Sequence, residues 1–230
     1  MSPKTEKKQY SFMQYLLAMM AACLVFAIMQ GIHDNYGIML NGIVAHTGID
    51  YASVSFVIAV GQILYGATQP IFGMLALKKS NAFVMMCGIV FMAVGLIVTP
   101  FCSGWWSLLI FFGILLPAGT GELCFGIVMG AVAPIIGEKR AAVASGIIQA
   151  SAGIGDALMS PLLQQFTDWR GVSFSMPVFA IPILLMLPVV FWLGNKRKKI
   201  KADNGENLPD EPKSESLSEI LHFAMRDCTY

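Results

Sequence analysis

Long stretches without a charged residue are the feature that most limits what this chain can fold into. Residues 9–33, 51–77 and 80–121 contain no Asp, Glu, Lys or Arg. A helix crosses the roughly 30 Å core of a bilayer with about 20 apolar residues, so the third stretch is long enough for two crossings. Only 13% of the residues are charged, whereas soluble domains average about 25%. The sequence therefore predicts an all-α protein that crosses a membrane several times.

Turn signals and isolated charges divide the chain into six predicted spans. The stretch Pro100–Gly104 separates the two helices of the longest apolar run, and Asp168–Gly171 separates the last two spans. The sixth span contains Pro177, Pro182 and Pro188, so we expect it to be kinked. The predicted spans, together covering 15–194, are about 15–38, 52–76, 81–100, 105–134, 141–165 and 173–194.

Both ends of the chain differ from the apolar middle. Residues 1–14 are polar, and residues 195–216 form a basic and then acidic stretch that is typical of a linker. Ser216 and Glu219 have the spacing of a capping box, and residues 217–230 follow the pattern of an amphipathic helix. We expect this helix to lead toward a missing seventh span, so that the chain is an N-terminal half.

The distribution of positive charge predicts the orientation. With the N-terminus in the cytoplasm, every Lys and Arg except Arg170 falls on the cytoplasmic side. We therefore expect a plasma-membrane protein with both termini cytoplasmic. No basic patch is interleaved with aromatic residues, so a nucleic-acid partner is not expected. The five cysteines are scattered without a CxxC motif, and we expect no disulfide framework, metal site or cofactor.

Polar side chains inside the predicted spans are candidates for function, because burying them in a bilayer is costly. Gln30 and Asp34 share a helix face, as do Gln149 and Asp156. Such groups suit the carriage of a proton or the balancing of a cation, but polar side chains also hold membrane helices together by hydrogen bonds. The candidates for a substrate pathway or for proton coupling are Gln30, His33, Asp34, Asn35, Gln62, Tyr65, Gln69, Glu122, Gln149 and Asp156.

One motif favours an enzyme as a remote alternative. Gly153–Asp156 reads GxGD and resembles the motif of intramembrane aspartyl proteases. Their chemistry needs two carboxyl groups that share a proton, and the resemblance implies a Tyr-Asp pair on the preceding span. This chain has Glu122 there and no Tyr-Asp pair. We therefore predict that the protein is not an enzyme.

Four stretches resemble the N-terminal half of a major facilitator superfamily transporter, and within that family the monocarboxylate transporters and oxalate–formate antiporters. The stretches are 30–40, with Gly31, Tyr36 and Gly37; 137–155, with Lys139, Arg140, Ala144 and Gly146; 161–174, with Trp169 and Arg170; and 216–230. Between spans two and three the family usually has an acidic residue. Leu77 stands in its place here.

The resemblance implies a six-helix bundle made of two inverted three-helix repeats, which is half of a major facilitator fold. It also implies alternating access around a cavity lined by spans one, two, four and five, with a small organic anion as the substrate. The partners would be the lipid bilayer and either the missing C-terminal half or a second copy. A self-contained six-span homodimeric carrier or channel is the alternative. Candidate gating residues in the inner loops are Lys78, Lys79, Lys139 and Arg140.

Overall fold

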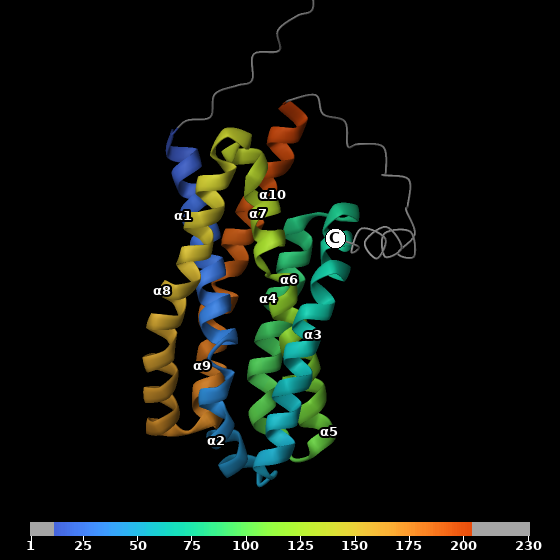
Figure 1. Ribbon diagram of the computed structural model, residues 1–230, viewed down its shortest axis with the longest axis vertical. Coiled ribbons are helices and arrows are strands. Elements are labelled where there is room, and N and C mark those ends of the chain that lie inside the picture. The colour runs from blue at the N-terminus through green and yellow to red at the C-terminus, as the bar shows by residue number, and fades with distance from the viewer. Residues whose placement is uncertain (1–11, 204–230) are drawn as a thin grey trace, which may run out of the picture.

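The computed structural model describes residues 12–203, which form a bundle of parallel and antiparallel helices (Figure 1). Within this range there is no strand, and six helical segments are long and apolar enough to cross a membrane. The predicted class, an all-α membrane protein with six spans, is confirmed. The predicted amphipathic helix at 217–230, the linker after Asp203 and most of the N-terminal segment 1–14 lie outside the described residues.

The first and second spans are joined by a short turn. The first span is α1 (Phe12–His33) followed by α2 (Tyr36–Thr47), and the second is α3 (Tyr51–Lys78). The first span ends at Thr47, later than the expected residue 38, because the helix continues until Gly48 closes it. Gly48 has φ 70° and closes α2 in the left-handed conformation that favours glycine.

The third and fourth spans are less regular. The third is α4 (Asn81–Val98), which is extended by the 3₁₀ turn η1 (Thr99–Phe101). The fourth consists of α5 (Trp105–Leu108), the π-helical segment η2 (Leu109–Leu115), α6 (Leu116–Glu122) and α7 (Phe125–Ile136).

The fifth span is one long helix and the sixth is broken. The fifth is α8 (Glu138–Arg170), and the sixth is α9 (Val172–Leu184) followed by α10 (Met186–Asp203). The break follows from Pro188, which has no N–H to donate to the carbonyl group of Leu184. The helix of α10 also continues through the first residues of the predicted linker. The start of α1 and the end of α10 lie at the same end of the bundle (Figure 1).

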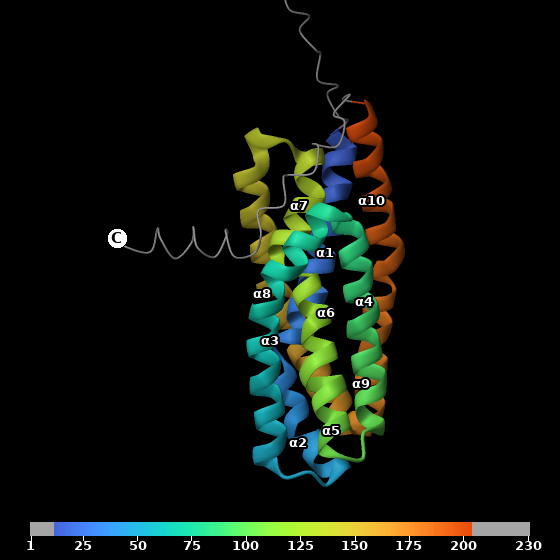
Figure 2. The ribbon, with the colours of Figure 1, turned by 90° about the vertical axis from the view of Figure 1, so that its right-hand side faces the viewer.

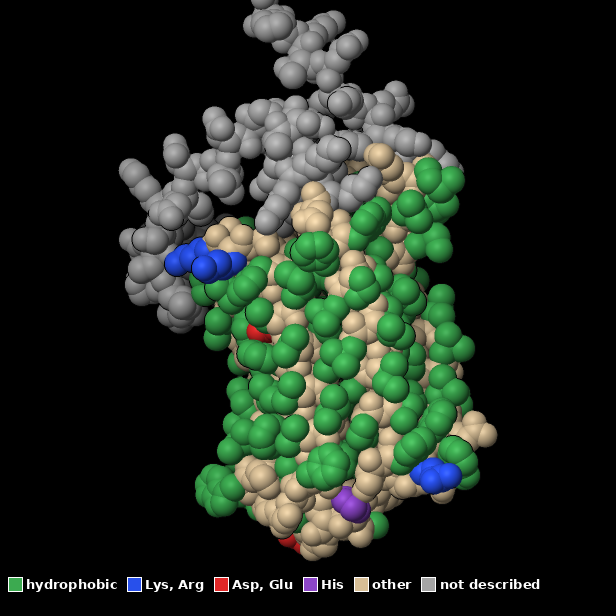
Figure 3. Space-filling view, turned by 180° about the vertical axis from the view of Figure 1, so that it is seen from behind, with side chains coloured by type: hydrophobic (Ala, Val, Ile, Leu, Met, Phe, Trp, Pro, Cys, Tyr) green, Lys and Arg blue, Asp and Glu red, His purple; other side chains and the backbone are tan. Residues whose placement is uncertain are grey.

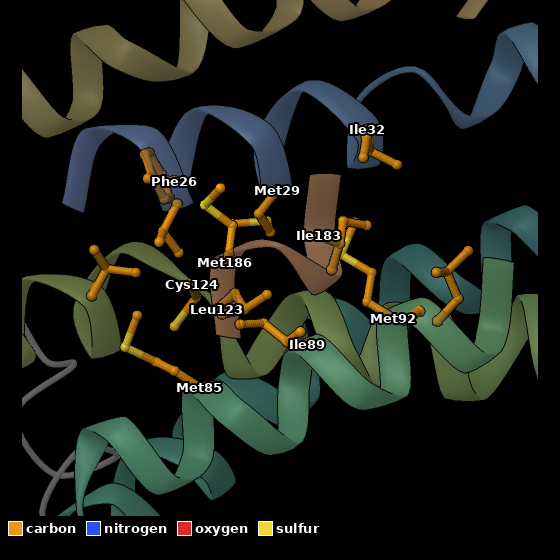
Figure 4. Packing of buried hydrophobic residues seen from close by; sticks show 14 of the residues in the cluster. Phe26, Met29, Ile32, Met85, Ile89, Met92, Leu123, Cys124, Ile183 and Met186 are labelled. Carbon is orange, nitrogen blue, oxygen red and sulfur yellow. The ribbon is translucent and has the colours of Figure 1, made fainter. Parts of the chain in front are cut away.

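The interior is rich in methionine. Met29 of α1, Met85 and Met92 of α4, and Met186 of α10 meet around Ile89 (Figure 4). Methionine is flexible and fills irregular gaps between helices that meet at different angles. Outside this core, a broad belt of hydrophobic side chains covers the surface between charged residues near the two ends (Figure 3). This belt is the surface expected of a protein surrounded by lipid.

Burial is uneven among the spans. In the most apolar window of each span, 17% of the α3 residues and 22% of the α8 residues are buried, against 39–61% in the other four spans. The second view of the bundle shows α3 along one side (Figure 2). Two helices of the bundle are therefore left largely uncovered by the rest of the described chain.

Candidate functional site

The first span is interrupted beside its predicted polar residues. Asn35 donates a hydrogen bond from Nδ2 to the carbonyl oxygen of Gly31 at 2.7 Å. In a regular helix the backbone N–H of Asn35 would make this bond, so its side chain replaces a lost helical bond. The role of Asn35 in the structure is therefore to hold the break between α1 and α2.

Three of the predicted residues form a hydrogen-bonded group at this break. Gln30 Nε2 donates to both carboxylate oxygens of Asp34, each at 2.8 Å. His33 Nδ1 lies 3.0 Å from Asp34 Oδ1. His33 is in the last turn of α1 and Asp34 precedes the first turn of α2, so the helix dipoles favour a positive charge on His33 and a negative charge on Asp34.

Asp156 joins this group from α8. Its carboxyl group lies close enough to that of Asp34 for the two to interact, and it also interacts electrostatically with His33. The Asp156 Oδ1 atom is buried and has no hydrogen-bond partner. Two carboxyl groups form a hydrogen bond with each other only when a proton lies between them, because two carboxylates repel each other. The arrangement can therefore hold a proton between α1 and α8.

Glycines bring these two helices together. A Cβ atom on Gly155 would collide with the backbone of Ala27, and one on Gly31 would lie 2.8 Å from Met159 Cγ. Small residues at such positions let membrane helices approach closely. In the GxGD motif, therefore, Gly155 serves helix packing and places Asp156 against α1.

Aromatic rings cover the inner side of the group. His33 is 3% exposed, and its ring centroid lies 4.2 Å from that of Tyr65 and 5.3 Å from that of Tyr36. The His33 Nε2 atom and the Tyr36 hydroxyl group are both buried without a partner of standard geometry, and the Tyr36 hydroxyl faces Thr120. Unpartnered polar atoms are costly inside a protein and are typical of functional positions.

Glu122 lies in a different part of the bundle. It ends α6, where the fourth span is interrupted at Leu123 and Cys124. Its side chain is 2% exposed and packs against α4, since a Cβ atom on Gly88 would lie 2.7 Å from Glu122 Cβ. The Oε2 atom has no hydrogen-bond partner. The structure therefore does not join Glu122 to the Asp34–Asp156 pair.

Two of the interrupted spans, the first and the fourth, each begin one of the predicted three-helix repeats. The second half-helix starts at Asn35-Tyr36-Gly37 in span one and at Cys124-Phe125-Gly126 in span four, counting each N-cap residue. If the two N-cap residues, Asn35 and Cys124, are taken as equivalent, His33 and Glu122 occupy equivalent positions two residues before them. A comparison of whole sequence halves does not detect it, because the similarity is confined to the breaks.

The remaining predicted pathway residues lie outside the hydrogen-bonded group at the α1–α2 break. Gln62 and Gln149 are exposed and Gln69 is half-buried. Among the described residues none of these three amides is part of the hydrogen-bonded group at the α1–α2 break.

The predicted gating residues lie at the end of the bundle where α1 begins. Lys78 and Lys79 are exposed at the end of α3. The Arg140 guanidinium lies over the ring of Tyr15, 5.2 Å from its centroid, and so connects α8 to α1. Lys139 is in the first turn of α8, and its side chain is outside the described set.

The structure supplies the second aspartate that a protease would need, but from α1 and without a Tyr-Asp motif. The carboxyl group that lies beside Asp156 is that of Asp34 on α1. In the described part of the chain, no three His, Cys, Asp or Glu side chains are grouped in a way that suits a metal ion.

Sequence reasoning missed a set of contacts at the opposite end of the bundle. His46 Nε2 lies 2.9 Å from the carbonyl oxygen of Pro100, and His46 Nδ1 lies 3.1 Å from Ser173 Oγ. The carbonyl group only accepts, so Nε2 carries the proton and Nδ1 accepts from Ser173. Spans one, three and six are thus linked through His46.

Comparison with known proteins identifies a family. The sequence profile described as Major Facilitator Superfamily matches residues 11–226. No curated protein sequence shows a significant match.

Proposed function

The chain belongs to the major facilitator superfamily and is a membrane transporter by family; from this premise we propose that it is a secondary active transporter of a small organic anion, such as a monocarboxylate or a dicarboxylate. It works by alternating access. The finer resemblance to monocarboxylate transporters and oxalate–formate antiporters supports this substrate class.

The observation that carries the proposal is the polar group at the α1–α2 break. Asp34 lies between α1 and α2 and interacts with Asp156, which lies near the middle of the fifth span. Ionisable residues at membrane depth are expensive and mark pathways for ions or substrates. The unpartnered atoms of His33 and Tyr36 beside them support a site that exchanges partners during transport.

The charges of the site suggest how it contributes. In residues 12–203, Lys and Arg lie toward the ends of the spans, whereas Asp34, Asp156 and Glu122 lie within the bundle. An organic anion prefers a cationic partner. We propose that this bundle supplies the proton-binding carboxyl groups, and that the cation for the anion comes from a partner.

That partner is a second six-helix bundle. The poor burial of α3 and α8 supports a second bundle that covers both. It is either the C-terminal half of a longer protein or a second copy of this chain; the second copy corresponds to a homodimeric carrier or channel. Reading the coding DNA beyond Tyr230 separates the two, because six further spans favour the first and a terminator with stable expression favours the second.

We propose that the protein lies in the plasma membrane with both termini in the cytoplasm. The positive charge in the sequence before α1 supports this orientation. Accessibility labelling of single cysteines introduced at position 78 and at position 170 tests it. Labelling of position 170, but not of position 78, from outside intact cells is the expected result, and the reverse pattern contradicts it.

The substrate class is tested by uptake into cells that express the protein. Uptake of labelled oxalate, formate or lactate should exceed that of cells with an empty vector, and an excess of unlabelled carboxylate should compete. If no carboxylate is taken up or competes while another class of solute does, the organic-anion proposal fails although the family holds. Peptide cleavage by the purified protein that is lost in Asp156→Asn would favour the remote protease alternative.

A further inference from the structure

A groove on the outside of the bundle lies between α1, α8 and α10. It has a volume of about 790 Å³. It is lined from α1 and α8 by residues that include Leu17, Leu24, Ala27 and Ile154, and from α10 by Pro188, Val189 and Trp192. α1 packs against both α8 and α10, so the groove is part of the bundle rather than a gap beside one helix.

The chemistry of the lining suits a hydrocarbon. The polar side chain in the wall is Ser151, and its hydroxyl group is already engaged, at 2.6 Å from the carbonyl oxygen of Ile148 and 3.1 Å from that of Cys23. A polar substrate or a peptide backbone would find no free partner for its own hydrogen-bonding groups here. Such a mismatch is costly in a low-dielectric environment.

The length of the groove matches one leaflet of the bilayer. Its α1 wall runs from Leu17 to Ala27, which at 1.5 Å per residue is about 15 Å. This is about half of the roughly 30 Å hydrocarbon core. An acyl chain that lies along the groove therefore has its polar end near Leu17.

A positive charge lies at that end. Arg140 is exposed and lies over Tyr15, two residues before Leu17. Basic residues at the level of the headgroups attract anionic lipids, at about 1 kcal/mol per charge.

We propose that this groove is a binding site for an anionic phospholipid of the surrounding bilayer. One acyl chain fills the groove between α1, α8 and α10, and the phosphate lies near Arg140. The site is separate from the polar group at the α1–α2 break and goes beyond the transport proposed above.

Photo-labelling of the full chain tests the site. The protein is placed in vesicles of phosphatidylcholine and phosphatidylglycerol with a trace of phosphatidylglycerol that carries a photoactivatable acyl chain. Peptides of α1, α8 and α10 that line the groove should carry the label. Labelling spread evenly over the exposed apolar faces, including α4, would overturn the proposal, and so would crosslinks between two copies of the chain through the groove.

Variants that fill the groove test whether the acyl chain binds there. Leu24 is 47% exposed and Ile154 is 61% exposed, so Leu24→Trp and Ile154→Trp fill the groove without changing the buried core. Labelling should fall about tenfold, which corresponds to displacing about two methylenes of the chain. The matched control is Val90→Trp on α4, at 44% exposed, which should leave labelling unchanged. Equal loss in the control, or no loss in the two groove variants, contradicts the proposal.

The headgroup is tested separately. Arg140→Gln should lower the preference for labelled phosphatidylglycerol over labelled phosphatidylcholine by about fivefold, while the same groove peptides remain labelled. Arg170→Gln, at the other end of α8, is the control and should leave the preference unchanged. Equal labelling of the wild-type protein by both lipids would contradict the proposal that the site prefers an anionic headgroup.

Discussion

A Cβ atom on Gly31 would lie 2.6 Å from the carbonyl oxygen of Gly155, so the backbones of α1 and α8 touch within one turn of the Asp34–Asp156 pair. The position of the two carboxyl groups thus depends on residues that have no side chain. The same contact explains why a GxGD sequence occurs in a chain whose family is one of transporters.

Gly155→Ala should destabilise the bundle, because the added methyl group meets the backbone of Ala27. Overpacking of this kind costs about 1–3 kcal/mol. The matched control is Gly153→Ala in the same motif, where a Cβ atom meets nothing within 4 Å. Thermal unfolding of the purified proteins in detergent measures both. Equal stability of the two variants would show that α1 and α8 are not in contact at Gly155.

Glu122→Met should raise stability, because it removes a carboxyl oxygen that is buried without a partner. Leaving such a group unsatisfied costs about 1–3 kcal/mol. If Glu122 also serves transport, uptake falls in the same variant while the unfolding midpoint rises. Titration with denaturant measures the change in stability, and a lower midpoint than wild type would mean that Glu122 has a stabilising partner.

His46→Ala should loosen the end of the bundle where spans one, three and six meet, because it removes the contacts with Pro100 and Ser173. A hydrogen bond contributes about 1 kcal/mol net. Ser173→Ala removes one contact and should have a smaller effect. The control is Ser145→Ala, whose hydroxyl group bonds only within its own turn, to Ala142. Hydrogen exchange of α9 measures the loosening, and equal exchange in His46→Ala and Ser145→Ala would contradict it.

Asp50 should make the start of α3 sensitive to acid. Its side chain accepts a hydrogen bond from the backbone N–H of Ser53 at 3.0 Å, and this interaction with Ser53 lowers the pKa of Asp50. A group whose pKa is lowered by folding stabilises the fold above its ordinary pKa and loses that contribution as the pH falls through the lowered value. Asp50→Asn keeps a capping side chain and should remove this part of the acid sensitivity, as followed by hydrogen exchange at Ser53. Unchanged acid sensitivity in the variant would rule out Asp50 as its source.

The six spans can be predicted from the sequence because burial in lipid demands about 20 apolar residues per helix, and charged residues are rare inside such runs. The kink of the sixth span also follows from local sequence, since Pro188 removes a helical hydrogen bond. The break after Asp34 does not, because it depends on whether the Asn35 side chain turns back to Gly31 or out to its neighbours.

The candidate site could be predicted only in part. Gln30, His33 and Asp34 are close in sequence and share a helix end, so their grouping follows from helix geometry. The pairing of Asp34 with Asp156 depends on how α1 and α8 pack, which hydropathy does not encode. The sequence also gave no reason to separate Glu122 from this group, because its side chain turns toward α4.

The central claim is that the Asp34–Asp156 pair serves transport. Its most direct test is carboxylate uptake by Asp34→Asn, Asp156→Asn and the double variant, each compared with Gln149→Ala on the same face of α8 as Asp156 and with its unfolding midpoint measured. We predict that each single variant loses most of the uptake while remaining folded, and that the double variant loses no more, because the two carboxyl groups act together. Wild-type uptake in both single variants, with Gln149→Ala unchanged, would contradict the claim.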